Sequence, residues 1–329
     1  MMRRIKRLLI LLFFLALSLA GSAAYYATRP LELPAQPFEF SLNQGTSLKG
    51  AARQLQQAGL IPSDLAFVWL GRALGKSTQI KAGNYELESA VTTLGLLDML
   101  TKGQVSQGEI GIIEGWTFNE FRAAVKVNPG LRHDSATLSE AEILQRIGAP
   151  EAHAEGLFFP DTYYFANGVS DLVIYKRSYQ TMQKHLQESW QGRVSGLPLE
   201  SPYQALTLAS IVEKETGQAR DRDAIAGVFI NRLRKGMRLQ TDPSVIYGIG
   251  EKFDGNLRKR DLLTDTPFNT YTRAGLPPTP IALPGLASLQ AALHPAKTDA
   301  LYFVSRGDGS SEFSATLVQH NRAVDRYQK

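Results

Sequence analysis

The sequence predicts a mixed α+β protein that begins with a membrane-spanning helix. Three observations support this fold class. An uncharged apolar segment lies close to the N-terminus, short alternating strands are each followed by an amphipathic helix, and longer helices and a hairpin follow toward the C-terminus. With 329 residues, of which 43% are hydrophobic and 20% charged, the chain can bury more than one hydrophobic core.

The apolar segment, residues 8–27, has the length of a transmembrane helix. At about 1.5 Å per residue it spans about 30 Å, the hydrocarbon thickness of a bilayer. Four basic residues precede it, so the tail of residues 1–7 is expected in the cytoplasm and the rest of the chain on the other side. A cleaved signal peptide is the alternative, because Ser22, Ala23 and Ala24 are small. Such peptides have apolar regions of only about 7–15 residues, which favours a retained single-pass anchor.

Composition excludes several classes of site. The chain has no cysteine, so disulfides, thiolate metal sites and cysteine nucleophiles are excluded. Its net charge is +5, but four positive charges precede the apolar segment, so the body is nearly neutral and nucleic acid is not an expected partner. The five histidines lack zinc-ligand spacing, and no serine-hydrolase or phosphate-binding loop motif is present. We therefore expect no metal and no cofactor.

Residues 28–37 contain three prolines and predict a short, stiff linker. The strand-and-helix pattern then appears three times, and residues 38–107 are expected to form a small module. The three copies of the pattern have expected strands at 38–42, 85–87 and 110–113, with Thr46, Thr92 or Thr93, and Thr117 as helix N-caps and Gly59 and Gly103 as C-caps. The pattern suggests a LysM-like α+β module. An ordinary packing unit that binds nothing is an equal alternative.

The helix expected over Tyr203–Gly217 contains two glutamates. At 100° per residue, Glu215 shares a face with apolar residues such as Ile211, whereas Glu213 lies about 160° away, so the two cannot enter one pocket. A carboxyl group on an apolar face should have a raised pKa, which suits a proton donor. Two solvated glutamates at a helix end remain the alternative, and helical geometry favours Glu215 only slightly.

The segments after this helix are expected to surround it. They are a second helix over Asp221–Lys235 with Asp221 as N-cap, a turn within Arg238–Gly250, an ordered loop over Thr266–Gly285, a hairpin containing Leu301–Val304, and a closing helix near His320. Upstream, residues 157–165 are dense in aromatic side chains, which predicts either core and turn or a wall for sugar rings.

Four segments resemble one family closely: ASIVEKET, FINRLRKGMRLQTDPSVIYG, FNTYTRAGLPP and HPAKTDALYFV. Together they resemble the endolytic murein transglycosylase family, the YceG-like proteins. The resemblance runs from the anchor to the C-terminus. It implies a single-pass inner-membrane protein with a LysM-like module and a periplasmic lytic transglycosylase domain, here residues 108–329.

The resemblance implies that Glu215, the second glutamate of the EKET motif, is the catalytic acid, with Thr216 as the hydroxyl residue that follows it. It also implies cleavage of the bond between MurNAc and GlcNAc in nascent glycan strands, with 1,6-anhydroMurNAc ends, and a role in terminating strand elongation. Peptidoglycan synthases, the penicillin-binding proteins, are the expected protein partners. Two positions depart from the family pattern: Thr279 replaces a glycine, and Glu312 replaces a histidine. Both departures concern loop shape and substrate contacts.

We expect the glycan to contact five residues of the following segments: Gln240, Asp242, Tyr247, Asn269 and Tyr271. A role in stabilising the loops is equally consistent with each. Two other functions stay open. A muramidase would hydrolyse the same bond with a second carboxylate, for which Asp242 is the candidate. A non-catalytic scaffold would bind the wall and recruit synthases.

Overall fold

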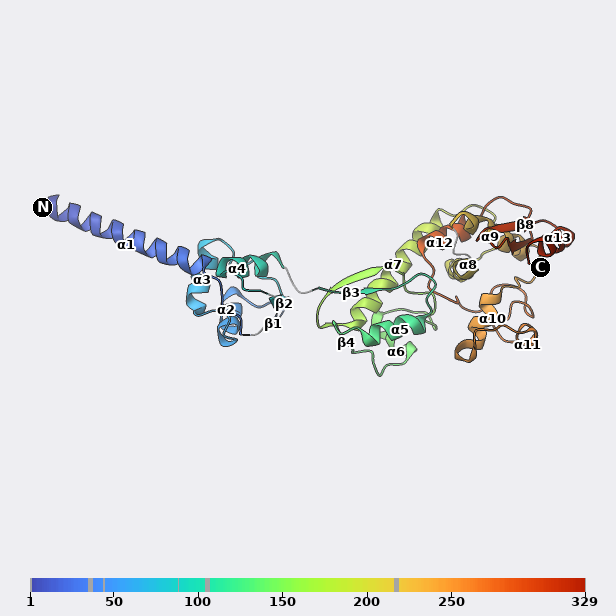
Figure 1. The fold of residues 1–329 in the computed structure, drawn as a ribbon, viewed down its shortest axis with the longest axis horizontal. Coiled ribbons are helices and arrows are strands. Elements are labelled where there is room, and N and C mark those ends of the chain that lie inside the picture. The colour runs from blue at the N-terminus through green and yellow to red at the C-terminus, as the bar shows by residue number, and fades with distance from the viewer. Residues whose placement is uncertain are drawn as a thin grey trace. The chain divides into compact units, whose positions relative to one another are not determined.

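The computed structural model describes residues 2–34, 38–43, 45–87, 89–103, 107–215 and 219–328 (Figure 1). The chain divides into two compact units. The first contains Met1–Gly108 and Tyr164–Val169, and the second contains Glu109–Tyr163 and Ser170–Lys329. The mixed α+β class expected from the sequence is confirmed.

The first unit begins with a long helix and continues with a small α+β body. Within α1, Leu9–Thr28 has a mean hydropathy of 2.0 and is long and apolar enough to cross a membrane. The elements in order are α1 (Met2–Thr28), β1 (Phe38–Leu42), α2 (Leu48–Gln57), α3 (Asp64–Ala73), β2 (Gly83–Leu87) and α4 (Thr93–Lys102). Strands β1 and β2 pair antiparallel, with Phe38 opposite Leu87.

Most caps of this unit follow the expected chemistry. Thr92 begins α4 by accepting a hydrogen bond from Gly95 N, and Gly103 ends it with a left-handed φ of 72°. The prediction of Thr46 as the cap of α2 was wrong by one residue. Ser47 accepts from Gly50 N, whereas the Thr46 hydroxyl donates to Asn43 O. Helix α3 was not expected, so two helices separate the paired strands.

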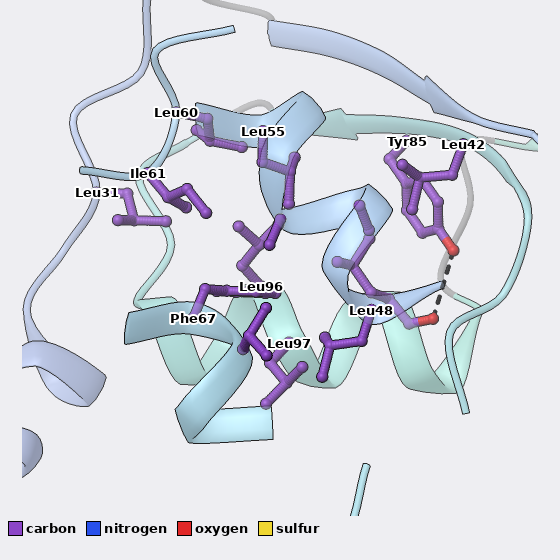
Figure 2. Close-up of a cluster of buried hydrophobic side chains, with 14 of the residues drawn as sticks. Leu31, Leu42, Leu48, Leu55, Leu60, Ile61, Phe67, Tyr85, Leu96 and Leu97 are labelled. Atoms are coloured by element: carbon purple, nitrogen blue, oxygen red, sulfur yellow. Dashed lines mark hydrogen bonds between the residues drawn. The ribbon is translucent and has the colours of Figure 1, made fainter. Parts of the chain in front are cut away.

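Leucines from the helices of this unit form a single core (Figure 2). Leu48, Phe67 and Leu97 point toward one another from three different helices, and each is at most 4% exposed. Leu31 is 7% exposed and joins the same core, so this part of the expected linker is packed. Residues 35–37 of the linker lie outside the described residues.

The remaining elements are mostly helical. In order they are β3 (Gln107–Gly111), α5 (Phe118–Val127), β4 (Leu131–Arg132), α6 (Glu140–Ile147), β5 (Thr162–Ala166), β6 (Val169–Ser170), α7 (Asp171–Gln191), α8 (Pro202–Glu215), α9 (Ala219–Arg234), α10 (Asp242–Ile249), a 3-10 helix (Gly250–Lys252), α11 (Lys259–Leu263), α12 (Leu286–Leu293), β7 (Tyr302–Ser305), β8 (Ser311–Ser314) and α13 (Leu317–Tyr327). Strand β3 pairs with β5, β4 with β6, and β7 with β8.

Three expectations for this part of the chain were incomplete. Helix α9 begins before Asp221, whose carboxylate accepts from Ser311 N at 2.7 Å instead of capping the helix. The segment expected as a turn contains helix α10, with Pro243 in its first turn. The aromatic residues near Phe158 are core: Phe158 is fully buried and stacks on Phe118, with ring centroids 5.4 Å apart.

Helix α8 is the central helix of the second unit. It packs against α7, α9, α10 and α12, and residues 205–212 are all buried. A helix that is apolar on every side belongs inside a core rather than at its surface. The described helix ends at Glu215, so that carboxyl group lies at the edge of this core.

Candidate active site

Glu215 is the centre of the candidate site. Its Oε1 accepts a hydrogen bond from the hydroxyl of Thr241, a residue that is 1% exposed. Burial raises the pKa of Glu215 to about 6; the Thr241 hydrogen bond lowers it, the charge of Asp242 raises it and that of Arg232 lowers it. A carboxyl group with this pKa can both give and take a proton near neutral pH.

Arg232 is the cation beside this carboxyl group, and it is 8% exposed. Its Nε donates to Leu301 O at 2.6 Å, and one terminal nitrogen donates to Leu239 O at 2.8 Å. These bonds hold the guanidinium in place from both sides. The charge therefore favours the ionised form of Glu215 without a direct ion pair between them among the described contacts.

Gln240 directly precedes Thr241 and has an unusual backbone. Its φ of 51° makes it the only non-glycine residue with positive φ in the described part of the chain. Its backbone N donates to Thr270 O at 3.1 Å, and its side-chain oxygen accepts from Arg232 at 3.3 Å. Such strain persists only where surrounding contacts enforce it, and it gathers at functional sites.

Asp242 and Tyr271 form a pair beside Glu215. The Tyr271 hydroxyl donates to Asp242 Oδ1 at 2.5 Å, and Asp242 is exposed. Burial raises the pKa of the Tyr271 hydroxyl, and the hydrogen bond to Asp242 and the charge of Glu215 raise it further. The phenol therefore stays protonated and can donate. The structure thus brings together four of the six site residues expected from the sequence.

The sequence matches the model of the YceG-like family over residues 40–326. The chain belongs to the YceG-like family. A relative from Bacillus subtilis strain 168, named endolytic murein transglycosylase, is 32% identical over 336 residues, which cover 93% of this chain and 90% of the relative. A relative of the same name from Streptococcus pneumoniae strain D39 is 27% identical over 95% of this chain, which spans 63% of that protein's length.

A solved structure also belongs to this comparison. The crystal structure of a YceG-like protein from Listeria monocytogenes matches with a TM-score of 0.54 and 29% sequence identity. The match covers 87% of this chain and 98% of the other. The resemblance inferred from the EKET and neighbouring motifs is therefore confirmed at the level of the YceG-like family.

Two of the residues expected to contact glycan in this YceG-like protein hydrogen-bond to other residues of the chain instead. Asn269 is fully buried; its amide nitrogen donates to the carbonyls of Asp261, Leu262 and Thr264, and its oxygen accepts from two backbone N–H groups. These contacts use the hydrogen-bonding capacity of the amide. Tyr247, in the C-terminal half of α10, donates a hydrogen bond from its hydroxyl to Glu155 Oε2 at 3.1 Å. The geometry favours a role in shaping the loops for both residues.

The sequence reasoning missed two features, one within the site and one that contacts Tyr247. One is the buried hydroxyl network of Thr241, Ser244 and Thr270, in which Thr270 Oγ1 accepts from Thr241 N at 3.0 Å. The other is Glu155, which is 7% exposed and accepts from Phe118 N at 3.0 Å. Burial raises the pKa of Glu155 to about 7. In the sequence, Glu155 could have been noticed only as a glutamate just before the aromatic residues 157–165.

Glu213 has a different environment from Glu215, although both are on α8. Glu213 Oε2 accepts from Gly285 N at 2.9 Å and so holds the end of the Pro-rich loop. Gly285 also approaches Glu114 so closely that a Cβ at this position would collide with its carboxylate. Burial raises the pKa of Glu114, and the charge of Glu213 raises it further.

The departures from the family pattern lie in packed or paired positions. Thr279 is 6% exposed and donates to Pro280 O at 2.8 Å, and Glu312 forms an ion pair with Arg306 on the β7–β8 hairpin. Thr216 and Gly217, expected to follow the acid and to end its helix, lie outside the described residues. No group of three or more His, Asp or Glu side chains that could hold a metal occurs among the described residues.

Proposed function

We propose that the protein is an endolytic murein transglycosylase that cleaves the bond between MurNAc and GlcNAc in peptidoglycan. The observation that carries the proposal is Glu215, a carboxyl group with a pKa of about 6 that accepts from Thr241 at the end of a buried helix. Family membership and relatives named endolytic murein transglycosylase support the same reaction.

One carboxyl group is sufficient for this reaction. Protonated Glu215 gives its proton to the oxygen that links MurNAc to GlcNAc, and the C1–O bond of MurNAc breaks. The resulting carboxylate takes a proton from the MurNAc C6 hydroxyl as O6 bonds to C1. The products are a free GlcNAc hydroxyl and a 1,6-anhydroMurNAc end, and no water is consumed. Arg232 and Thr241 favour the carboxylate between the two steps.

Of the five residues expected to contact glycan, we keep three as proposed contacts: Gln240, Asp242 and Tyr271. Gln240 and Asp242 are exposed, and the Tyr271 hydroxyl is positioned by Asp242. Tyr247 and Asn269 are proposed to act indirectly, by holding α10 and the loop that carries Tyr271.

A muramidase is the second candidate, because Asp242 lies close enough for its charge to raise the pKa of Glu215. A retaining or inverting hydrolase needs a second carboxylate of this kind. The products separate the two reactions, since hydrolysis leaves a reducing MurNAc end. Mass spectrometry of peptidoglycan digested by the pure protein should therefore show anhydro ends, and reducing ends would replace the transglycosylase proposal with the muramidase.

The variant Glu215→Gln tests the assignment of the acid. The amide cannot donate a proton to the leaving oxygen, so cleavage should fall by about 10²–10⁴-fold. Glu213→Gln is the matched control, because its amide oxygen can still accept from Gly285 N and activity should stay close to wild type. Full activity of Glu215→Gln would remove Glu215 from the mechanism, and absence of cleavage by the wild type would favour the wall-binding scaffold.

We also propose a location for the protein, a role for its first unit and a role in strand termination, on the basis of the apolar helix and the family. The apolar helix α1 would anchor the protein in the inner membrane with residues 1–7 in the cytoplasm and the catalytic domain in the periplasm. The body of residues 38–107 would be a LysM-like module that binds glycan. Cleavage of nascent strands beside penicillin-binding proteins would terminate their elongation.

A further inference from the structure

Helix α3 has two apolar faces. Phe67 and Val68 are buried against the core of the first unit, whereas Leu65 is 66% and Trp69 68% exposed. Leu65, Trp69 and Arg72 are spaced four and three residues apart, so they share one side of the helix, called here the α3 face. Large apolar side chains gathered on a surface indicate a binding partner for that surface.

The α3 face lies at the end of the anchor. The Tyr26 hydroxyl donates to Ser63 O at 3.2 Å, and Ser63 is the N-cap of α3. Tyr26 is two residues from the end of the apolar segment Leu9–Thr28, which is the depth of a membrane interface. Figure 1 shows α3 beside this end of α1. With α1 spanning a bilayer, helix α3 would begin at the level of the lipid headgroups.

A second set of contacts holds the same end of α1 to the body. Leu31 N donates to Val91 O at 2.8 Å, and Pro30 forms a bridge with Thr92, the N-cap of α4. With Leu31 buried, the three residues after the helix cannot act as a free hinge. The position of α3 relative to the membrane is thus set by packing.

The side chains of the α3 face suit a lipid surface. Tryptophan is enriched at membrane interfaces, leucine inserts among acyl chains, and arginine binds phosphate. The Arg72 guanidinium lies 6.0 Å from the centre of the Trp69 ring, so the cation and the aromatic ring occupy one small area. We propose that the α3 face binds the outer surface of the bilayer that α1 spans. The proposal rests on α1 being a retained anchor.

Trp69 fluorescence in lipid vesicles tests the proposal. The full chain carrying Trp116→Phe and Trp190→Phe has Trp69 as its single tryptophan. In vesicles of phosphatidylcholine and phosphatidylglycerol, the Trp69 emission maximum should lie at shorter wavelength than that of the same chain unfolded in urea without detergent. Lipids brominated near the headgroup should quench this emission.

Single-cysteine labels give an independent reading, because the natural chain contains no cysteine. A nitroxide on Leu65→Cys should become shielded from a water-soluble relaxation agent in vesicles. Lys102→Cys is the control, since Lys102 ends α4, whose other end lies at the anchor. Its label should stay accessible to the agent.

The outcomes distinguish the anchor from the α3 face. Flotation of the full chain with vesicles reports whether α1 inserts. If the chain floats while Trp69 is not quenched and the label at position 65 stays accessible, the membrane contact is wrong and a protein partner covers the α3 face. If the chain does not float, the anchor and the inference both fail, whereas cleavage of peptidoglycan is unaffected as evidence for the proposed reaction.

Discussion

The proton on Glu215 is controlled by neighbours that act in opposite directions. Burial favours the protonated acid, while the hydroxyl of Thr241 and the charge of Arg232 favour the carboxylate. The result is a pKa of about 6, between that of an ordinary glutamate and the pH of a neutral compartment. An acid that must later act as a base benefits from this balance, because neither form is strongly disfavoured.

Thr241→Val should move the pH dependence of cleavage. The Thr241 hydroxyl makes no cap bond to α10, and its bond to Glu215 stabilises the carboxylate. Without that bond the pKa of Glu215 rises above about 6, so more acid stays protonated as the pH increases. The alkaline limb of kcat/KM should therefore shift to higher pH. Measurement from pH 4 to 9 tests this, with Thr241→Ser as the control that keeps the hydroxyl. A limb that stays in place would exclude the hydrogen bond as a determinant.

At the scale of elements, the segment between α9 and α10 places the site residues. Arg232 on α9 donates to the carbonyls of Arg238 and Leu239, and the next residue, Gln240, takes a left-handed φ. This backbone conformation places Thr241 within hydrogen-bond distance of Glu215, and Asp242 within hydrogen-bond distance of Tyr271. The geometry of the site thus depends on one buried guanidinium with several backbone acceptors.

Arg232→Met should destabilise the protein much more than Arg234→Met. Removing Arg232 takes the donor from one buried carbonyl, Leu239 O, and from two partly buried ones, and a buried unsatisfied group costs about 1–3 kcal/mol. A total loss of about 3 kcal/mol or more is expected. Arg234 is exposed and donates only to Gly196 O among the described contacts, so its loss should cost under about 1 kcal/mol. Urea unfolding measures both, and equal effects would contradict the role assigned to Arg232.

At the scale of the whole molecule, two carboxyl groups whose pKa is raised by desolvation link folding to pH. Glu155 and Glu215 have pKa values raised to about 7 and about 6 from an ordinary 4.5. Between pH 4.5 and these values the folded chain binds more protons than the unfolded chain, so stability falls as the pH rises. Their contribution is fully present below pH 4.5 and is lost as the pH passes through the folded pKa.

Glu155→Gln should remove part of this pH dependence. The amide has no charge to bury, and its oxygen can still accept from Phe118 N. The free energy of unfolding of the wild type, relative to the variant, should fall by about 3 kcal/mol between pH 4.5 and pH 8. Urea unfolding at several pH values measures this difference. A relative stability that stays constant with pH, or rises, would show that folding does not raise the pKa of Glu155.

Local patterns explain which elements were predictable. Thr92 and Thr117 were recognised as N-caps because a cap side chain accepts from a backbone N–H only three residues further along the chain. Helix α3 was missed because its exposed face is as apolar as its buried one, which conceals the periodicity. For α8, which is buried on all sides over residues 205–212, helical geometry favoured Glu215 over Glu213 only slightly.

The sequence by itself determined the apolar N-terminal helix, the helix that carries Glu215 and membership of the YceG-like family, because each depends on residues that are close in the chain. Only the tertiary structure decided the partners of these residues. Thr241 reaches Glu215 across 26 positions, and Tyr247 reaches Glu155 across 92. Such pairs form when the core places distant segments side by side, and no local pattern records them.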